Sequence, residues 1–248
     1  MAWIAIVGIG LGVGFLAGLF GKGGSAVATP LLAAAGVPPL VALTAPLPAA
    51  IPTSLAGELA YRGSGGPDRR VLLWSAAFGV PATIAGALAS RLVGGTILLR
   101  ATDLLIFALG LRLTLRRRTD VPVVPMPRHP TSRLAFVATG VGLVSGLLAN
   151  SGGFLLAPLY VIALRMPIKR AFATSLAVAA ILAVPGTLAH WELGHLDWTV
   201  VAVFAAASVP TAFVGARVAV RTSAPRLERI YGAALVLLGP VFLALSFR

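Results

Sequence analysis

Two glycine-rich turns carry the polar residues whose types and spacing are best suited to chemistry. The first lies in "LFGKGGSAVATP" at residues 19–30, where Lys22 stands between glycines inside an apolar run. A phosphate-binding P-loop needs a glycine five residues before the Gly-Lys pair and a serine or threonine directly after the lysine. Leu16 and Gly23 occupy those two positions. The sequence therefore does not predict a nucleotide site at this lysine.

The second turn is "ANSGG" at residues 149–153, and the two turns together are typical of an anion site. Glycine allows a tight turn and close backbone approach. A helix that begins at such a turn directs free N–H groups and the positive end of its dipole toward the space in front of it. A lysine in the first turn adds a full charge. We predict that the ligands of the anion are Lys22, Gly23, Gly24, Ser25, Asn150, Ser151, Gly152 and Gly153.

The elements that position these turns are membrane-spanning helices. The chain is 58% hydrophobic and 11% charged, whereas about a quarter of the residues of a soluble domain are charged. Apolar stretches of bilayer length, roughly 17–25 residues, occur at residues 40–60, 71–90, 171–190, 199–217 and 230–247. The short alternating strands of a transmembrane barrel are missing from the sequence. We predict an all-α polytopic membrane protein with about 8–10 membrane segments.

The net charge of +13 fits this class. Cytoplasmic loops of membrane proteins accumulate Lys and Arg, and here the basic residues lie between apolar segments without interleaved aromatic residues. We therefore predict no nucleic-acid partner. The chain has no cysteine, which excludes disulfides, thiolate metal sites and cysteine nucleophiles.

The chain divides at the basic, proline-rich segment "RRRTDVPVVPMPRHPTSR", residues 116–133. "GFLAGLFGKGGSAVATPLL" before it aligns with "GLVSGLLANSGGFLLAPLY" after it, so that four positions of glycine or proline coincide. Internal repetition of this kind is typical of transporters. We predict one membrane domain made of a first repeat at residues 1–115, a cytoplasmic linker at residues 116–133 and a second repeat at residues 134–248.

Charge predicts that the two repeats have opposite orientations. Residues 36–40 lack Lys and Arg and are expected outside, whereas their counterpart in the second repeat carries Arg165, Lys169 and Arg170 and is expected inside. Residues 4–35 span roughly 48 Å as helix, too little for two full crossings of a ~30 Å core. Each repeat is therefore expected to open with a helical hairpin whose tip lies at membrane depth, followed by three further helices.

Two further groups of polar residues are candidates for the transport pathway or for coupling. Glu58 and Arg62 are i,i+4 neighbours, so they can pair, either as an interfacial anchor or as a gate or proton-coupling site. The hydroxyl residues near them and near the start of the helix at residues 171–190 can cap and pack helices or line the path. This second set consists of Thr53, Ser54, Thr174 and Ser175.

The ordered motifs of both halves resemble those of the TauE/SafE sulfite exporter family. In the first half these are the glycine-rich tip, "GVPPLVAL" and "PTSLAGELAYRG", and in the second half "SGGFLLAPLY" and "AFATSLAVAA". The resemblance covers nearly the whole chain apart from the linker. It implies export of a small sulfur-containing or organic anion, such as sulfite or sulfoacetate, through a bacterial inner membrane. Lys22 departs from many members of the family, which have an apolar residue there, and Pro46 replaces the threonine expected from the "ATSL" motif of the second half, residues 173–176.

We therefore expect a secondary transporter that moves sulfite, an organosulfonate or a related carboxylate by alternating access, with membrane lipid and coupled protons as partners. A passive anion channel is the first alternative, because a fixed basic site also suits a channel. An integral-membrane enzyme is the second, but no nucleophile–base pair or metal constellation is evident. "HWELGH" at residues 190–195 does not have the spacing of a zinc protease motif. No metal site and no cofactor are predicted.

Overall fold

The structure is a bundle of helices. It is a computed structural model that describes residues 3–21, 25–89, 131–147, 153–192, 194 and 196–245, and no strand occurs within these residues. Five helical segments of the described chain are long and apolar enough to cross a membrane: Trp3–Phe20, Leu40–Ser64, Arg69–Ala89, Ile168–Glu192 and Trp198–Arg221. The prediction of a polytopic all-α membrane protein is therefore confirmed.

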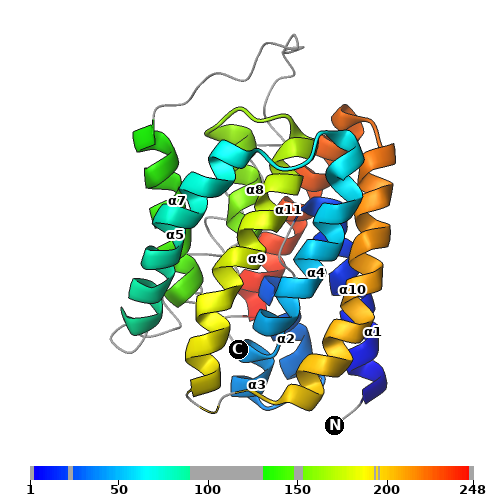
Figure 1. The fold of residues 1–248 in the computed structure, drawn as a ribbon. Helices are drawn as coiled ribbons and strands as arrows, with labels where there is room; N and C mark the ends of the chain where they lie inside the picture. The colour runs from blue at the N-terminus through cyan, green and yellow to red at the C-terminus, as the bar shows by residue number, and fades with distance from the viewer. Residues whose placement is uncertain are drawn as a thin grey trace.

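The helices follow the predicted apolar stretches, and in each half of the chain further helices precede these stretches (Figure 1). In chain order they are α1 (Trp3–Phe20), α2 (Ser25–Ala34), α3 (Pro39–Thr44), α4 (Pro46–Tyr61), the 3₁₀ turn η1 (Arg62–Ser64), α5 (Arg69–Ala89), α7 (Thr131–Leu147), α8 (Gly153–Ile162), α9 (Ile168–Glu192), α10 (Trp198–Arg221) and α11 (Ala224–Leu245). The last three residues of the predicted linker, 131–133, form the first turn of α7, and its other residues lie outside the described part of the chain.

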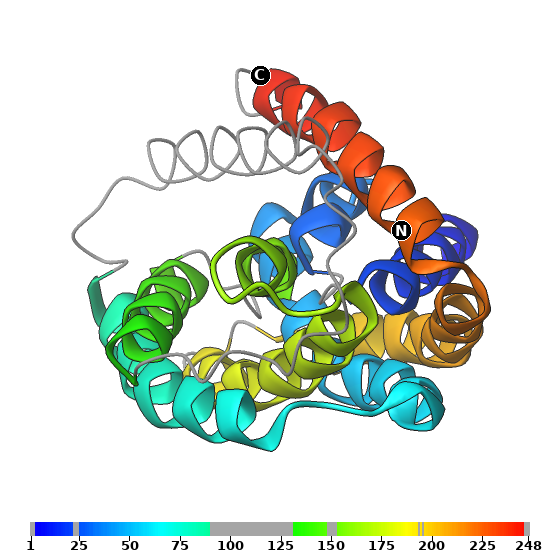
Figure 2. The same ribbon diagram turned by 90° about the horizontal axis from the view of Figure 1, so that it is seen from above.

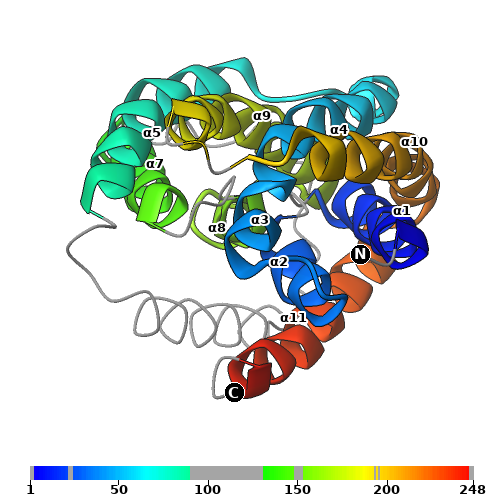
Figure 3. The same cartoon turned by 90° about the horizontal axis from the view of Figure 1, so that it is seen from below.

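Helices α2 and α8 are short, as expected for the second arms of two hairpins. Each has ten residues, about 15 Å of helix, or half of a ~30 Å hydrocarbon core. They begin one residue after Gly24 and Gly152, where the glycine-rich turns end. In the views along the bundle, α2 and α8 lie in the interior, between the α4–α9 side and α11 (Figures 2 and 3).

Glycines bring α1 directly against α10. Gly10, Gly14 and Gly18 face Ala207, Ser208 and Ala212 in that order, so the two helices run parallel. A methyl group at Gly18 would lie 2.7 Å from the carbonyl carbon of Ala212. These glycines are four residues apart, so they lie along one side of α1. Only a residue without a side chain allows such close backbone approach.

Helices α5 and α7 pair in the same manner. Gly142 of α7 faces Gly79 and Ala82 of α5, and Gly146 faces Ala87 one to two turns further along, so these helices also run parallel. In the first pair, α1 opens the first half of the chain and packs on α10 of the second half. In the second pair, α7 opens the second half and packs on α5 of the first half.

Helices α4 and α9 are the most buried of the candidate spans. In the most apolar part of each span, 61% is buried in Leu40–Ser64, which contains α4, and 67% in α9. The corresponding share is 33% to 44% in α1, α5 and α10. Gly57 faces Leu176 and Gly186 faces Leu47, so α4 and α9 run antiparallel. The α4–α5, α8–α9 and α10–α11 connections lie together at one end of the bundle, and the α2–α3 and α9–α10 connections lie at the other (Figure 1).

Candidate functional site

Only the edges of the two predicted turns belong to the described part of the chain. Ser25 and Gly153 are the first residues of α2 and α8. The other expected ligands lie outside the described residues, namely Lys22, Gly23, Gly24, Asn150, Ser151 and Gly152.

The start of the first turn is fixed inside the bundle by α9. Gly21 is buried and has a φ of 62°, a left-handed backbone conformation that favours glycine. A methyl group there would lie 2.8 Å from the ring of Phe172. The buried hydroxyl of Ser175 donates a hydrogen bond to the Gly21 carbonyl. Ser175, a predicted pathway residue, is thus brought to the residue that precedes Lys22 in the chain.

Four aromatic residues from four helices surround the same place, and we call them the aromatic cluster: Phe20, Tyr61, Phe172 and Tyr231. The Phe172 ring lies edge-on to Tyr231, with centroids 4.9 Å apart, and to Tyr61 at 6.5 Å. Tyr231 also contacts Phe20 at 5.4 Å. The Tyr61 hydroxyl donates to the Gly18 carbonyl over 3.0 Å. The cluster therefore holds the carboxyl end of α1, where the glycine turn begins.

Two fully buried hydroxyl groups near these elements have no hydrogen-bond partner in the described structure. They belong to Ser54 on α4, which is 1% exposed, and to Tyr231 on α11, which is 0% exposed. A buried polar group without a partner costs about 1–3 kcal/mol, and native structures contain few of them. Both groups are therefore candidates for contact with a bound molecule.

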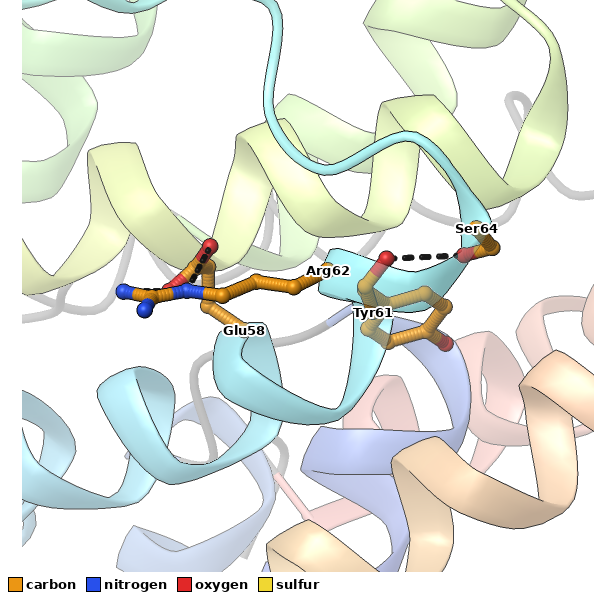
Figure 4. A network of polar contacts seen from close by, with 4 residues as sticks. All are labelled: Glu58, Tyr61, Arg62 and Ser64. Carbon is orange, nitrogen blue, oxygen red and sulfur yellow. Dashed lines mark hydrogen bonds and ion pairs between the residues drawn. The ribbon is translucent and has the colours of Figure 1, made fainter.

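The predicted pair of Glu58 and Arg62 is confirmed (Figure 4). Nε and Nη2 of Arg62 each lie 3.5 Å from a carboxylate oxygen of Glu58. The Glu58 side chain is 8% exposed and that of Arg62 is 67% exposed. Because both contacts are long, the pair is weak.

A second ion pair was not predicted from the sequence. Oδ2 of the buried Asp68 lies 3.1 Å from Nη2 of Arg170, and Oδ1 caps α5 by accepting from the Val71 N–H. The Asp68 N–H donates to the Thr174 hydroxyl over 2.9 Å, and that hydroxyl donates to the Arg170 carbonyl. Thr174 therefore ties α9 to the start of α5. An aspartate just before a helix is a recognisable N-cap signal in a sequence. The sequence carries no corresponding signal for the partners of Asp68 on α9.

Thr53 has a structural contact in this conformation. Its hydroxyl lies 2.9 Å from that of Ser208, and both residues are buried where α4 meets α10. Of the predicted pathway residues, Ser175 thus contacts the start of the glycine turn, Thr53 and Thr174 join helices, and Ser54 has a hydroxyl without a partner.

Known proteins similar to this chain are membrane transporters. The family model "Sulfite exporter TauE/SafE" matches residues 6–241. A "Probable membrane transporter protein" of Xylella fastidiosa (strain 9a5c) is 31% identical over 242 residues, which cover 94% of this chain and 92% of the relative. The "Probable membrane transporter protein YunE" of Bacillus subtilis (strain 168) is 25% identical over 241 residues, with coverage of 88% and 87%. No solved structure gives a significant match.

The family match spans nearly the whole chain, and the apolar helices agree with it. The resemblance predicted from the sequence motifs is thereby confirmed, and the protein is a membrane transporter and not an enzyme. This chain belongs to the TauE/SafE sulfite exporter family.

Proposed function

We propose that the protein exports a small anion across the membrane by alternating access, the substrate being sulfite, an organosulfonate such as sulfoacetate, or a related small sulfur or carboxylate anion. The observation that carries the proposal is the buried start of the first glycine turn. Gly21 is enclosed by Phe172 and Ser175 of α9, and Lys22 follows it directly. A charge next to a buried backbone segment needs a partner, and a bound anion is the partner that a transporter supplies.

The two short helices support an anion site. Helix α2 begins at Ser25 and α8 at Gly153, so each glycine turn leads into a helix amino terminus. The first N–H groups of a helix lack intrahelical acceptors and carry partial positive charge. Broken helices serve anionic substrates in this way in inverted-repeat transporters. The proposed ligands are those predicted from the sequence: Lys22, Gly23, Gly24, Ser25, Asn150, Ser151, Gly152 and Gly153.

The helix directions support two inverted repeats, residues 1–115 and 134–248. Helices α1, α4 and α10 run one way and α5, α7 and α9 the other (Figure 1). The contact of Gly14 with Ser208 has its counterpart in that of Gly142 with Gly79, and Asp68 and Asp197 cap α5 and α10 at matching places. In this proposal, one repeat moves against the other to open the site to each side in turn.

The distribution of basic residues supports a cytoplasmic location for the end with the α4–α5 and α8–α9 connections. Those connections and the helix starts beside them carry Arg69, Arg70, Arg165 and Lys169, whereas the sequence between α9 and α10, at the opposite end, has no Lys or Arg. The positive-inside rule assigns the basic end to the cytoplasm. In the bacterial inner membrane, the proposed location, the opposite end of the bundle then faces away from the cytoplasm. Single cysteines at Thr119 and Gly194 should be labelled from opposite sides. Labelling of both from one side would contradict the inverted topology.

Lys22→Met tests the anion site, and Lys169→Met is its matched control. The chain has only these two lysines, and Lys169, at the start of α9, donates to the Val220 carbonyl over 2.6 Å. Removal of a charge-assisted contact costs about 1.5–3 kcal/mol, so Lys22→Met should bind sulfite or sulfoacetate about 10- to 150-fold more weakly while inserting and folding at least as well as wild type. Lys169→Met should bind normally. Unchanged affinity in folded Lys22→Met would refute the site.

Glu58→Gln tests proton coupling, with the exposed Glu192→Gln as control. If the buried Glu58 carboxylate carries a proton, the glutamine variant should lose the pH dependence of flux and still bind the anion. If Glu58 only anchors Arg62, the variant should lose stability and keep its pH response. A wild-type flux that a proton gradient does not change would favour the passive channel over a coupled transporter.

A further inference from the structure

Three tyrosine side chains are completely buried, and their hydroxyl groups differ in one respect. The Tyr61 hydroxyl donates to the Gly18 carbonyl, and the Tyr160 hydroxyl lies 2.7 Å from that of Ser75. The hydroxyl of Tyr231 has no hydrogen-bond partner in the described structure. All three residues have 0% exposure, so this difference does not come from unequal access to water.

The ring of Tyr231 lies against the residues that start the first glycine turn. It contacts Phe20, the residue before Gly21, and Phe172, whose backbone and ring enclose Gly21. Tyr231 is thus the contribution of α11 to the aromatic cluster, and its ring lies against the residues from which the turn begins.

The other hydroxyl groups at this place are already engaged. Ser175 donates to the Gly21 carbonyl and Tyr61 to the Gly18 carbonyl. Each of these groups has one proton to donate, so neither is available for a ligand in this conformation. Tyr231 supplies the free donor at the cluster.

Packing alone does not account for a tyrosine at this position. A phenylalanine would make the same ring contacts with Phe20 and Phe172 without burying a polar group. The hydroxyl therefore needs an acceptor that is not part of the described chain. A negatively charged oxygen is the strongest acceptor for such a donor.

We propose that the hydroxyl of Tyr231 binds an oxygen of the transported anion and that α11 thereby forms one wall of the substrate site. This inference rests on the proposed function and adds to it a residue outside both glycine turns.

Tyr231→Phe in the full-length protein removes only this donor. We expect the variant to fold with a melting temperature equal to or above that of wild type, because a buried polar group without a partner is removed. Its affinity for sulfite or sulfoacetate, measured by calorimetry on purified protein, should fall about 10-fold or more, as expected for a lost hydrogen bond to a charged group.

Tyr160→Phe is the matched control. It removes an equally buried hydroxyl that is bonded to Ser75, so it should lower the melting temperature and leave the affinity for the anion unchanged. A folded Tyr231→Phe that binds sulfite and sulfoacetate as wild type does would overturn the inference and leave the proposed function intact. Failure of the wild type itself to bind any small anion would overturn both.

Discussion

The contact between α1 and α10 predicts that Gly18→Ala destabilises the protein. A methyl group at Gly18 would lie 2.7 Å from the carbonyl carbon of Ala212 and 2.8 Å from the backbone nitrogen of Ala216. Carbon atoms in good contact are about 3.5–4.0 Å apart, so the helices would have to separate by about 1 Å. The atoms in the way belong to the backbone of α10 and cannot rotate aside. Overpacking of this kind costs about 1–3 kcal/mol.

Thermal unfolding in detergent measures this effect, and Gly12→Ala is the control. Gly12 lies on the same helix, and a methyl group there meets nothing within 4 Å. Gly18→Ala should melt several degrees below wild type, whereas Gly12→Ala should melt at or above it, because alanine favours a helix. Gly146→Ala, at the corresponding contact of α7 with α5, should behave like Gly18→Ala. Equal melting temperatures for Gly18→Ala and Gly12→Ala would refute the packing argument.

Two further predictions concern the polar contacts between helices. Asp68→Asn keeps an N-cap acceptor but loses the charge that faces Arg170, so the variant should lose about 1 kcal/mol of stability, and the loss should depend on salt. Asp197→Asn should be nearly neutral, because the Asp197 carboxylate only caps α10. Equal losses of the two variants in urea unfolding would argue against a role of the ion pair. Thr53→Val leaves the Ser208 hydroxyl only its long bond of 3.4 Å to the Ala205 carbonyl and should cost about 0.5–1.5 kcal/mol. Thr53→Val/Ser208→Ala should restore part of this loss in the same assay. A double variant less stable than Thr53→Val would contradict this reasoning.

The helices could be predicted from the sequence because their cause is local. An uninterrupted apolar stretch of bilayer length forms a helix wherever it inserts, since lipid offers the backbone no other partner. The predicted stretches at residues 71–90 and 199–217 correspond to α5 and α10. The starts of α2 and α8 were predicted from the two glycine-rich turns that precede them in the sequence. The Glu58–Arg62 pair was predicted from the i,i+4 spacing of the two residues.

The contacts between helices could not be predicted in the same way. A helix in a bilayer is apolar on every side, so periodicity does not show which side meets another helix. The bonds of Ser175 to Gly21 and of Thr53 to Ser208 join residues more than 150 positions apart. Tyr231 has no distinguishing neighbour in the sequence. Its interest comes only from the absence of a partner in the described structure, which is a property of the packed bundle.

The packing of α1 on α10 has a consequence for the synthesis of the protein. Chains leave the ribosome amino terminus first at about 5–20 residues per second, so the roughly 180 residues between these helices take about 10–40 s to make. During that time the glycine face of α1 has no protein surface to cover it and must remain in the bilayer against lipid. The order of insertion is therefore not the order of packing. Two halves made as separate polypeptides should mature only when they meet in the same membrane, because each half carries the helix on which the other half's first helix rests.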